Sequence, residues 1–166
     1  DYVQARIDDN YNFDDDEYSI TENRTHKLAD NMAAYIAEKG YNAFSQSDEN
    51  LIAEGKFDAA HKESLLPNKT IALLAGLGWI GYGAAQCLGT VLTDALLETF
   101  LCETLHPHCG KCTACVNICE RKVLKGKVWS TSVSRDEIVD VYGCSTCLKC
   151  LVHCPYTRRY CKQSTK

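Results

Sequence analysis

The sequence contains no run of 18 consecutive apolar residues, so we expect no membrane-spanning helix and no membrane partner. It also lacks a visible secretory signal peptide, which argues against a secreted disulfide scaffold despite eleven cysteines. The first residue is Asp1 rather than Met, so the sequence leaves open whether it is a fragment of a longer protein. Its 166 residues and 45% hydrophobic content suit one ordinary domain or two small ones.

Negative charge is scarce in the last third of the chain. Residues 105–166 carry 11 Lys and Arg against 4 Asp and Glu, a net charge of +7. Residues 1–104 carry 7 against 18, a net charge of −11. The basic part could form a nucleic-acid surface. We favour a different interpretation, in which Lys and Arg side chains offset the negative charge of clustered cysteine thiolates.

Eight of the eleven cysteines fall into two runs of the same spacing. The first run is Cys109-x-x-Cys112-x-x-Cys115-x-x-x-Cys119, and the second is Cys144-x-x-Cys147-x-x-Cys150-x-x-x-Cys154. Pro155 follows the second run, as in bacterial ferredoxins, whereas Glu120 follows the first. This pattern predicts two [4Fe–4S] clusters.

The spacing also predicts which cysteines share a cluster. Three cysteines two residues apart wrap a tight loop around three iron atoms, and in two-cluster ferredoxins the fourth ligand comes from the other run. We therefore predict a crossed arrangement, in which cluster binding also folds this region. The predicted ligands are Cys109, Cys112, Cys115 and Cys154 for cluster 1, and Cys144, Cys147, Cys150 and Cys119 for cluster 2.

Two zinc ions are the main alternative for the cysteine runs, since zinc also takes four thiolate ligands. Zinc sites more often use pairs of cysteines, frequently with histidine, so we favour iron–sulfur clusters. Such clusters imply a reducing compartment, and we expect a cytoplasmic protein. The remaining cysteines and nearby histidines are predicted to be structural, because both quartets are already complete. These residues are Cys87, Cys102, Cys161, His106 and His108.

The first hundred residues show the periodicity of helices and short strands. Leu28, Met32, Tyr35 and Ile36 recur at helical spacing, which predicts a helix over 20–39 with these side chains on one face. A short strand is expected over 41–47 and a short helix around 49–54. Residues 1–19, with an acidic block at 14–17, are predicted to be a solvated arm or part of an absent domain.

A glycine-rich segment, Gly76-x-Gly78-x-x-Gly81, matches the dinucleotide-binding pattern as text. About 27 residues separate Gly81 from the first cluster cysteine, too few for a doubly wound nucleotide domain. We instead predict a helix over 69–76 with Asn68 as its cap, a turn over 76–83 and a strand near 88–93. The glycines would let a flat ligand or another backbone approach closely.

Between the two cysteine runs, the sequence predicts a turn or hairpin over 123–129 around Gly126. Ser134 is predicted to cap a short helix over 135–142. Trp129 and Tyr142 are expected to shield a cluster from water, which is one way in which proteins tune cluster potentials.

Four motifs in residues 71–154 follow a familiar order. They are AGLGWIG, LGTVLTD, CGKCTAC and the final CxxCxxxCP. This order resembles the epoxyqueuosine reductase family, which is related to the cobalamin-dependent reductive dehalogenases. The resemblance begins around residue 20. The glycine segment followed by two ferredoxin runs is the specific part of it.

The resemblance implies an α+β fold, with a partial nitroreductase-like α/β domain over 1–104 and a ferredoxin-like two-cluster module over 105–166. It implies a cobalamin held near Gly78, Trp79 and Gly81, and an acidic proton donor, for which Asp48 is the candidate. The clusters would receive electrons from a ferredoxin or flavodoxin and pass them to the cobalamin. The implied substrate is a modified base in tRNA.

The sequence departs from the family pattern at several positions. Tyr82 replaces the lysine that follows GWIG, the segment before LGTVLTD is short, and Gln46-Ser47-Asp48 stands where the family has its acid. Two other functions therefore remain open. The chain could be an electron carrier without a corrinoid, or an electron-donating subunit of a separate enzyme.

Overall fold

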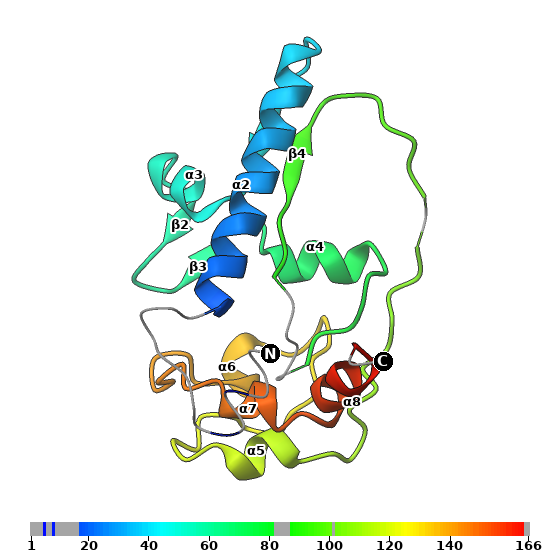
Figure 1. Ribbon diagram of the computed structural model, residues 1–166. Helices are drawn as coiled ribbons and strands as arrows, with labels where there is room; N and C mark the ends of the chain where they lie inside the picture. The colour runs from blue at the N-terminus through cyan, green and yellow to red at the C-terminus, as the bar shows by residue number, and fades with distance from the viewer. Residues whose placement is uncertain (1–4, 6–7, 9–16, 82–86, 101, 165–166) are drawn as a thin grey trace. The chain divides into compact units, whose positions relative to one another are not determined.

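The computed structural model describes residues 5, 8, 17–81, 87–100 and 102–164, without the side chains of residues 161, 163 and 164. These residues form two compact units (Figure 1). We call residues 17–78 and 87–105 the strand unit, and residues 79–81 and 106–164 the cysteine unit. Helices and small sheets together confirm the α+β class. The predicted functional division after residue 104 stays a prediction. Tyr82, Gly83 and most of the acidic block lie outside the described residues.

The strand unit is built around one long helix and a pair of strands (Figure 1). Helix α2 (Glu17–Glu38) packs against β1 (Ala43–Ser45) and β4 (Val91–Thr93), which pair antiparallel with Phe44 opposite Leu92. The predicted helix and both predicted strands are confirmed. The pairing joins two segments that lie far apart in the sequence. The result is one helix packed against a two-stranded sheet.

The face of α2 that meets the strands differs from the predicted one. Leu28 and Tyr35 are 64% and 56% exposed, whereas Ala29 is only 6% exposed. A Cβ atom on Gly89 would lie 3.2 Å from Thr25 Cγ2 and 3.4 Å from Ala29 Cβ. The backbone before β4 therefore lies close to α2, and only small side chains fit at this contact.

Two short helices and a hairpin complete the strand unit. Helices α3 (Asp48–Ala53) and α4 (Asn68–Leu74) confirm the predicted helices in these segments. The hairpin of β2 (Phe57–Asp58) and β3 (Glu63–Ser64) was not predicted. Asn68 is the first residue of α4 rather than its cap, because Pro67 holds the cap position. The Asn68 side chain instead donates a hydrogen bond to the Leu88 carbonyl at 3.3 Å.

Gly76 ends helix α4 and gives the glycine-rich segment a structural role. The Gly76 N–H donates to the Leu73 carbonyl and the Leu77 N–H donates to the Ala72 carbonyl, both at 3.0 Å. Gly76 has a φ of +66°. This is a Schellman motif, in which glycine takes the left-handed conformation after the helix. A dinucleotide-binding site requires a strand directly before the glycines, and the structure has helix α4 there.

Replacing Gly76 with alanine is expected to destabilise the protein by about 2–4 kcal/mol, from left-handed strain and a steric clash. The new Cβ would lie 2.8 Å from Cys102 Cβ. Gly78→Ala is the matched control, because nothing lies within 4 Å of its added Cβ. Urea denaturation of both variants measures the difference. Equal stability of the two variants would contradict this role of Gly76.

Residues 106–164 of the cysteine unit, all of them described, contain four short helices and little regular pairing. They are α5 (Ala114–Ile118), α6 (Arg135–Ile138), α7 (Lys149–Val152) and α8 (Pro155–Ser164). Ser134 forms a capping box with Glu137 at the start of α6, as its predicted capping role requires, although the helix ends earlier than predicted. The predicted turn has a left-handed glycine at Gly126, but Leu124 pairs with Val139 rather than within a local hairpin.

A small apolar core supports the cysteine unit. Its buried members are Val123, Ile138, Leu151 and Val152, of which Val152 is only 1% exposed. In the described part of the chain, no helix combines the length and the apolar character that a membrane crossing requires.

Candidate metal centre

The first cysteine run forms a tight loop that leads into α5. The Cys112 N–H donates to the Cys109 carbonyl at 2.9 Å, and Gly110 between them has a φ of +52°. Cys115 lies within α5, and Cys119 directly follows this helix. The loop therefore reverses direction between Cys109 and Cys112, as a chain must do to present successive thiols to one site.

The second run also contains left-handed turns, here at two residues that are not glycine. Thr146 has a φ of +53° and Leu148 a φ of +58°. The Thr146 N–H donates to Cys144 Sγ at 3.4 Å. Left-handed turns of this kind expose successive backbone N–H groups on one side, where they can bind an anion. Such N–H donors are suited to a thiolate that ligates iron.

The segment before Cys144 is fixed by the carboxylate of Asp140. Its Oδ1 atom accepts hydrogen bonds from the N–H groups of Tyr142 and Gly143, each at 3.1 Å. A Cβ on Gly143 would lie 2.7 Å from Asp140 Oδ2, so glycine is needed for this approach. Arg121 Nε donates to the Gly143 carbonyl at 3.1 Å, which ties this turn to the end of the first run.

The electrostatics of Cys109 link the two runs. Burial raises the pKa of the Cys109 thiol, and the neighbouring Cys154 and Cys112 raise it further. Burial likewise raises the pKa of Cys115, with a smaller contribution from Cys109 and Cys112. The thiols of Cys109, Cys112 and Cys115 thus influence one another electrostatically, and the thiol of Cys154 influences that of Cys109. This neighbourhood is compatible with the crossed ligand set predicted for cluster 1.

Three cysteines of the second run are also close together. Burial raises the pKa of Cys150, and the thiols of Cys147, Cys144 and Cys115 add to this rise. The contribution of Cys115 reflects the packing of α5 against α7, which lie side by side (Figure 1). Several thiolates at close range repel one another, and partial burial adds to this cost, so these thiols are favoured either protonated or bound to a cation.

Cys119 has a different environment. Burial acts to raise the pKa of its thiol, but backbone N–H groups of residues 121–124 donate to the sulfur and lower the pKa overall. Lys122 among them has a φ of +56°. The sulfur of Cys119 is therefore prepared to carry negative charge, as a metal ligand must.

An ion pair connects the two runs at the position where the first run departs from the ferredoxin pattern. Lys149 Nζ lies 2.5 Å from Glu120 Oε1. The hydrogen bond from Lys149, with its positive charge, lowers the pKa of Glu120. Glu120 thus replaces the usual proline with a contact to the second run, between two exposed side chains.

No three Cys, His, Asp or Glu side chains converge tightly enough to hold one ion in the described part of the chain. The two predicted ligand sets therefore remain predictions. The donors nevertheless fit an iron–sulfur cluster, because they are thiols on left-handed loops with N–H groups directed at sulfur. Cys87 is half-buried and Cys102 is exposed. The side chain of Cys161 lies outside the described part.

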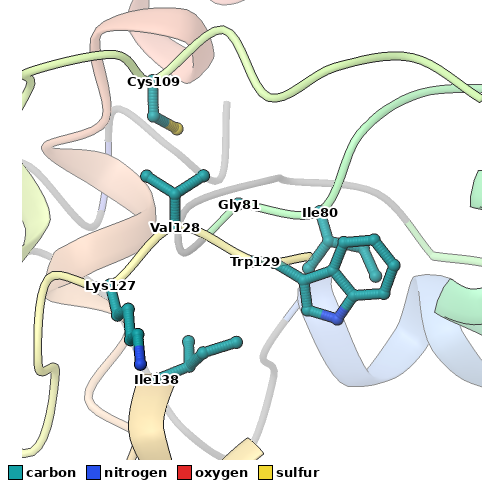
Figure 2. Close-up of a pocket in the computed structure, with 7 residues that line it drawn as sticks. All are labelled: Ile80, Gly81, Cys109, Lys127, Val128, Trp129 and Ile138. Carbon is teal, nitrogen blue, oxygen red and sulfur yellow. The ribbon is translucent and has the colours of Figure 1, made fainter. Parts of the chain in front are cut away.

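A small pocket lies beside Cys109 within the cysteine unit (Figure 2). Apart from Cys109 it is lined by Ile80, Gly81, Lys127, Val128, Trp129 and Ile138. Figure 2 shows Cys109 on one side of the pocket and Lys127 and Ile138 on the other. Trp129 is thus next to a predicted cluster ligand, whereas Tyr142 is 57% exposed. Lys127 is paired with Glu137.

The residues predicted to hold a corrinoid are divided between the two units. Gly78 belongs to the strand unit, whereas Trp79 and Gly81 belong to the cysteine unit. The Trp79 ring stacks on His108 with centroids 4.6 Å apart and meets Tyr156 edge-on at 5.2 Å. Sequence reasoning missed these contacts, since nothing in the spacing joins residues 79, 108 and 156.

The candidate proton donor Asp48 is the first residue of α3 and is exposed. Its neighbour Ser47 is buried and donates to Asp30 Oδ1 at 2.9 Å. Asn50 Nδ2 donates to the same oxygen at 3.0 Å. Asp30 is a second carboxylate at this end of β1, and sequence reasoning did not identify it because it lies on the distant helix α2. The role of Asp48 remains a prediction.

The chain is similar in sequence to two reductases. No family model and no solved structure matches the chain. The chain is 29% identical over 118 residues to an epoxyqueuosine reductase of Xanthomonas campestris pv. campestris, covering 66% of this chain and 28% of the relative. It is 23% identical over 150 residues to an epoxyqueuosine reductase of Lactococcus garvieae, covering 75% and 41%. The chain thus spans less than half the length of these relatives, and its similarity is to reductases of one kind.

Proposed function

We propose that this chain is a redox module that binds two [4Fe–4S] clusters and supplies electrons to a reductase site, as part of an epoxyqueuosine reductase-like protein. The observation that carries the proposal is the pair of cysteine runs, which share the spacing of a two-cluster ferredoxin and contain left-handed turns. The similarity to two epoxyqueuosine reductases supports it.

Each cluster, when bound, takes up and releases one electron at a time. The protein supplies thiolate ligands from both runs, in the two crossed sets predicted from the sequence. Backbone N–H groups near Cys119 and Cys144 stabilise negative charge on sulfur. The buried side chains of Leu151 and Val152, which adjoin the second cysteine run, limit the access of water to the proposed clusters. These contacts set the reduction potentials at which electrons pass.

The proposed reductase site belongs to a partial nitroreductase-like domain over 1–104, followed by a ferredoxin-like module over 105–166. A cobalamin would be held near Gly78, Trp79 and Gly81, with Asp48 as proton donor. A ferredoxin or flavodoxin would supply electrons. The net charge of +7 on residues 105–166 supports an anionic partner, including a tRNA substrate.

An electron carrier without a corrinoid is the second candidate. It is favoured by the ring contacts of Trp79, which are with His108 and Tyr156 in the cysteine unit. An aromatic residue engaged in this way is less free to pack against a corrinoid ring. In this case the chain would serve a separate enzyme as its electron-donating subunit.

Titration of the iron-loaded chain with hydroxocobalamin separates the two candidates. The reductase proposal predicts a saturable shift of the corrinoid absorption bands, because protein contacts change the surroundings of the cobalt. A Gly78→Leu variant is the control, since its added side chain should block the site without touching the cysteine runs. An unshifted spectrum at every ratio of corrinoid to protein would leave only the electron-carrier function.

A further inference from the structure

Three aromatic side chains join the two cysteine runs in the cysteine unit. Trp79 stacks on His108 at an interplanar angle of 22° and meets Tyr156 at 76°. The Tyr156 hydroxyl donates to the His108 carbonyl at 2.6 Å. Both arrangements are favourable for aromatic pairs. The three residues come from parts of the sequence that are far apart, so the cluster fixes the relative positions of these segments.

The aromatic cluster lies beside two predicted ligands of cluster 1. His108 directly precedes Cys109, and Tyr156 follows Cys154 by two residues. The hydrogen bond from Tyr156 to the His108 carbonyl therefore ties the backbone at one ligand to the backbone beyond the other. Trp79 covers both aromatic partners, and so it stabilises the contact between the two runs where their ligands must meet.

The indole nitrogen of Trp79 and the sulfur of Cys109 border the same space beside Gly81. A Cβ on Gly81 would lie 3.7 Å from Trp79 Nε1 and 3.6 Å from Cys109 Sγ. The Trp79 N–H donates a hydrogen bond to the Cys109 sulfur, and this bond partly opposes the rise in pKa that burial causes. Gly81 leaves room for this approach because it has no side chain.

We propose that Trp79 is a positioning residue for cluster 1: its indole N–H donates to the Cys109 sulfur and raises the reduction potential of that cluster. This inference rests on the proposed two-cluster function. One-electron reduction adds one negative charge to the cluster and its sulfur ligands. A donor directed at a sulfur stabilises the reduced form more than the oxidised form, so removal of the donor favours the oxidised form.

The test is an EPR-monitored redox titration of the full chain with Trp79→Phe, which removes the N–H and keeps an aromatic ring. We expect the reduction equilibrium of one cluster to fall about tenfold, or about 59 mV for a one-electron couple. The other cluster and the iron content should be unchanged. Trp129→Phe is the matched control, because it makes the same change beside Cys109 and keeps an aromatic ring that shields the cluster, while the hydrogen bond to this sulfur comes from Trp79. We expect it to shift the potential less than Trp79→Phe.

A second measurement does not depend on the folding of the Trp79 variant. The Trp129→Phe chain, in which Trp79 is the remaining tryptophan, is labelled with ¹⁵N-indole tryptophan and reduced. Pulsed EPR should then detect hyperfine coupling between the indole ¹⁵N and a reduced cluster. Unchanged potentials in Trp79→Phe, or an absence of ¹⁵N coupling in chains with about eight irons, would overturn the role of Trp79 alone. A wild-type chain without clusters would overturn the proposed function as well.

Discussion

Replacing Cys154 with serine is expected to remove about half of the bound iron, because each of two [4Fe–4S] clusters holds four iron atoms. Cys154 is the predicted crossing ligand of cluster 1, and its thiol lies near Cys109. Cluster 2 should persist, since its predicted ligands are unchanged. Iron analysis of the anaerobically reconstituted variant gives the result directly. Cys102→Ser is the control, because Cys102 is exposed and belongs to neither run.

Alkylation of the same variant shows which cysteines lost their cluster. If ligands cross between the runs, Cys109, Cys112 and Cys115 become open to iodoacetamide in the Cys154→Ser chain. If each run held its own cluster, Cys144, Cys147 and Cys150 would be labelled instead. Mass spectrometry distinguishes the two patterns. Labelling of the second run, or full retention of iron, would contradict the crossed arrangement.

Removal of iron by a chelator is expected to unfold the cysteine unit. Three of its helices are very short: α5 has five residues, and α6 and α7 have four each. Helices of this length are unstable alone, and the buried apolar core of this unit is small. Cluster binding would therefore supply much of the folding free energy, as structural zinc does in small domains.

Limited proteolysis with and without iron measures this dependence. We expect new cleavage sites after chelation at the basic residues between 111 and 159, because trypsin cuts after Lys and Arg once the chain is flexible. Reconstitution with iron and sulfide should restore the original pattern. Equal protease resistance of the iron-free and iron-loaded chains would show that the core alone holds this unit together.

Local sequence patterns predicted α2, α3, α4, α6, β1 and β4, whereas α5, α7 and α8 in the cysteine unit were not predicted. The patterns also failed where a distant segment decides which side chains are buried. Helix α2 was expected to bury Leu28 and Tyr35, but the close approach of Gly89 selects the smaller side chains on another face. The periodicity of α2 alone cannot reveal this, since the partner segment lies more than 50 residues away. The β2–β3 hairpin was missed because two-residue strands carry almost no periodic signal.

In the candidate site, too, local features can be predicted from the sequence, whereas contacts between distant segments cannot. Cysteine spacing predicts two ligand sets, which stay predictions, and the tight turn between Cys109 and Cys112 shows why spacing is informative within one local loop. The contacts of Trp79 with His108 and Tyr156 depend on how three distant segments pack, so the sequence offered no signal for them. The glycine segment was expected to let a flat ligand or another backbone approach, and the structure shows that its first glycine, Gly76, ends α4. The expectation for Gly78 and Gly81 stays a prediction. A glycine pattern has several physical explanations, and only the flanking elements distinguish them.

Iron and acid-labile sulfide analysis of the anaerobically reconstituted wild-type chain, combined with EPR after reduction, tests the central claim most directly. The two-cluster account predicts about eight iron and eight sulfide atoms per chain, with EPR signals from two interacting [4Fe–4S] clusters. Two zinc ions per chain without sulfide would contradict it, because thiolate zinc sites need no inorganic sulfur and carry no electrons.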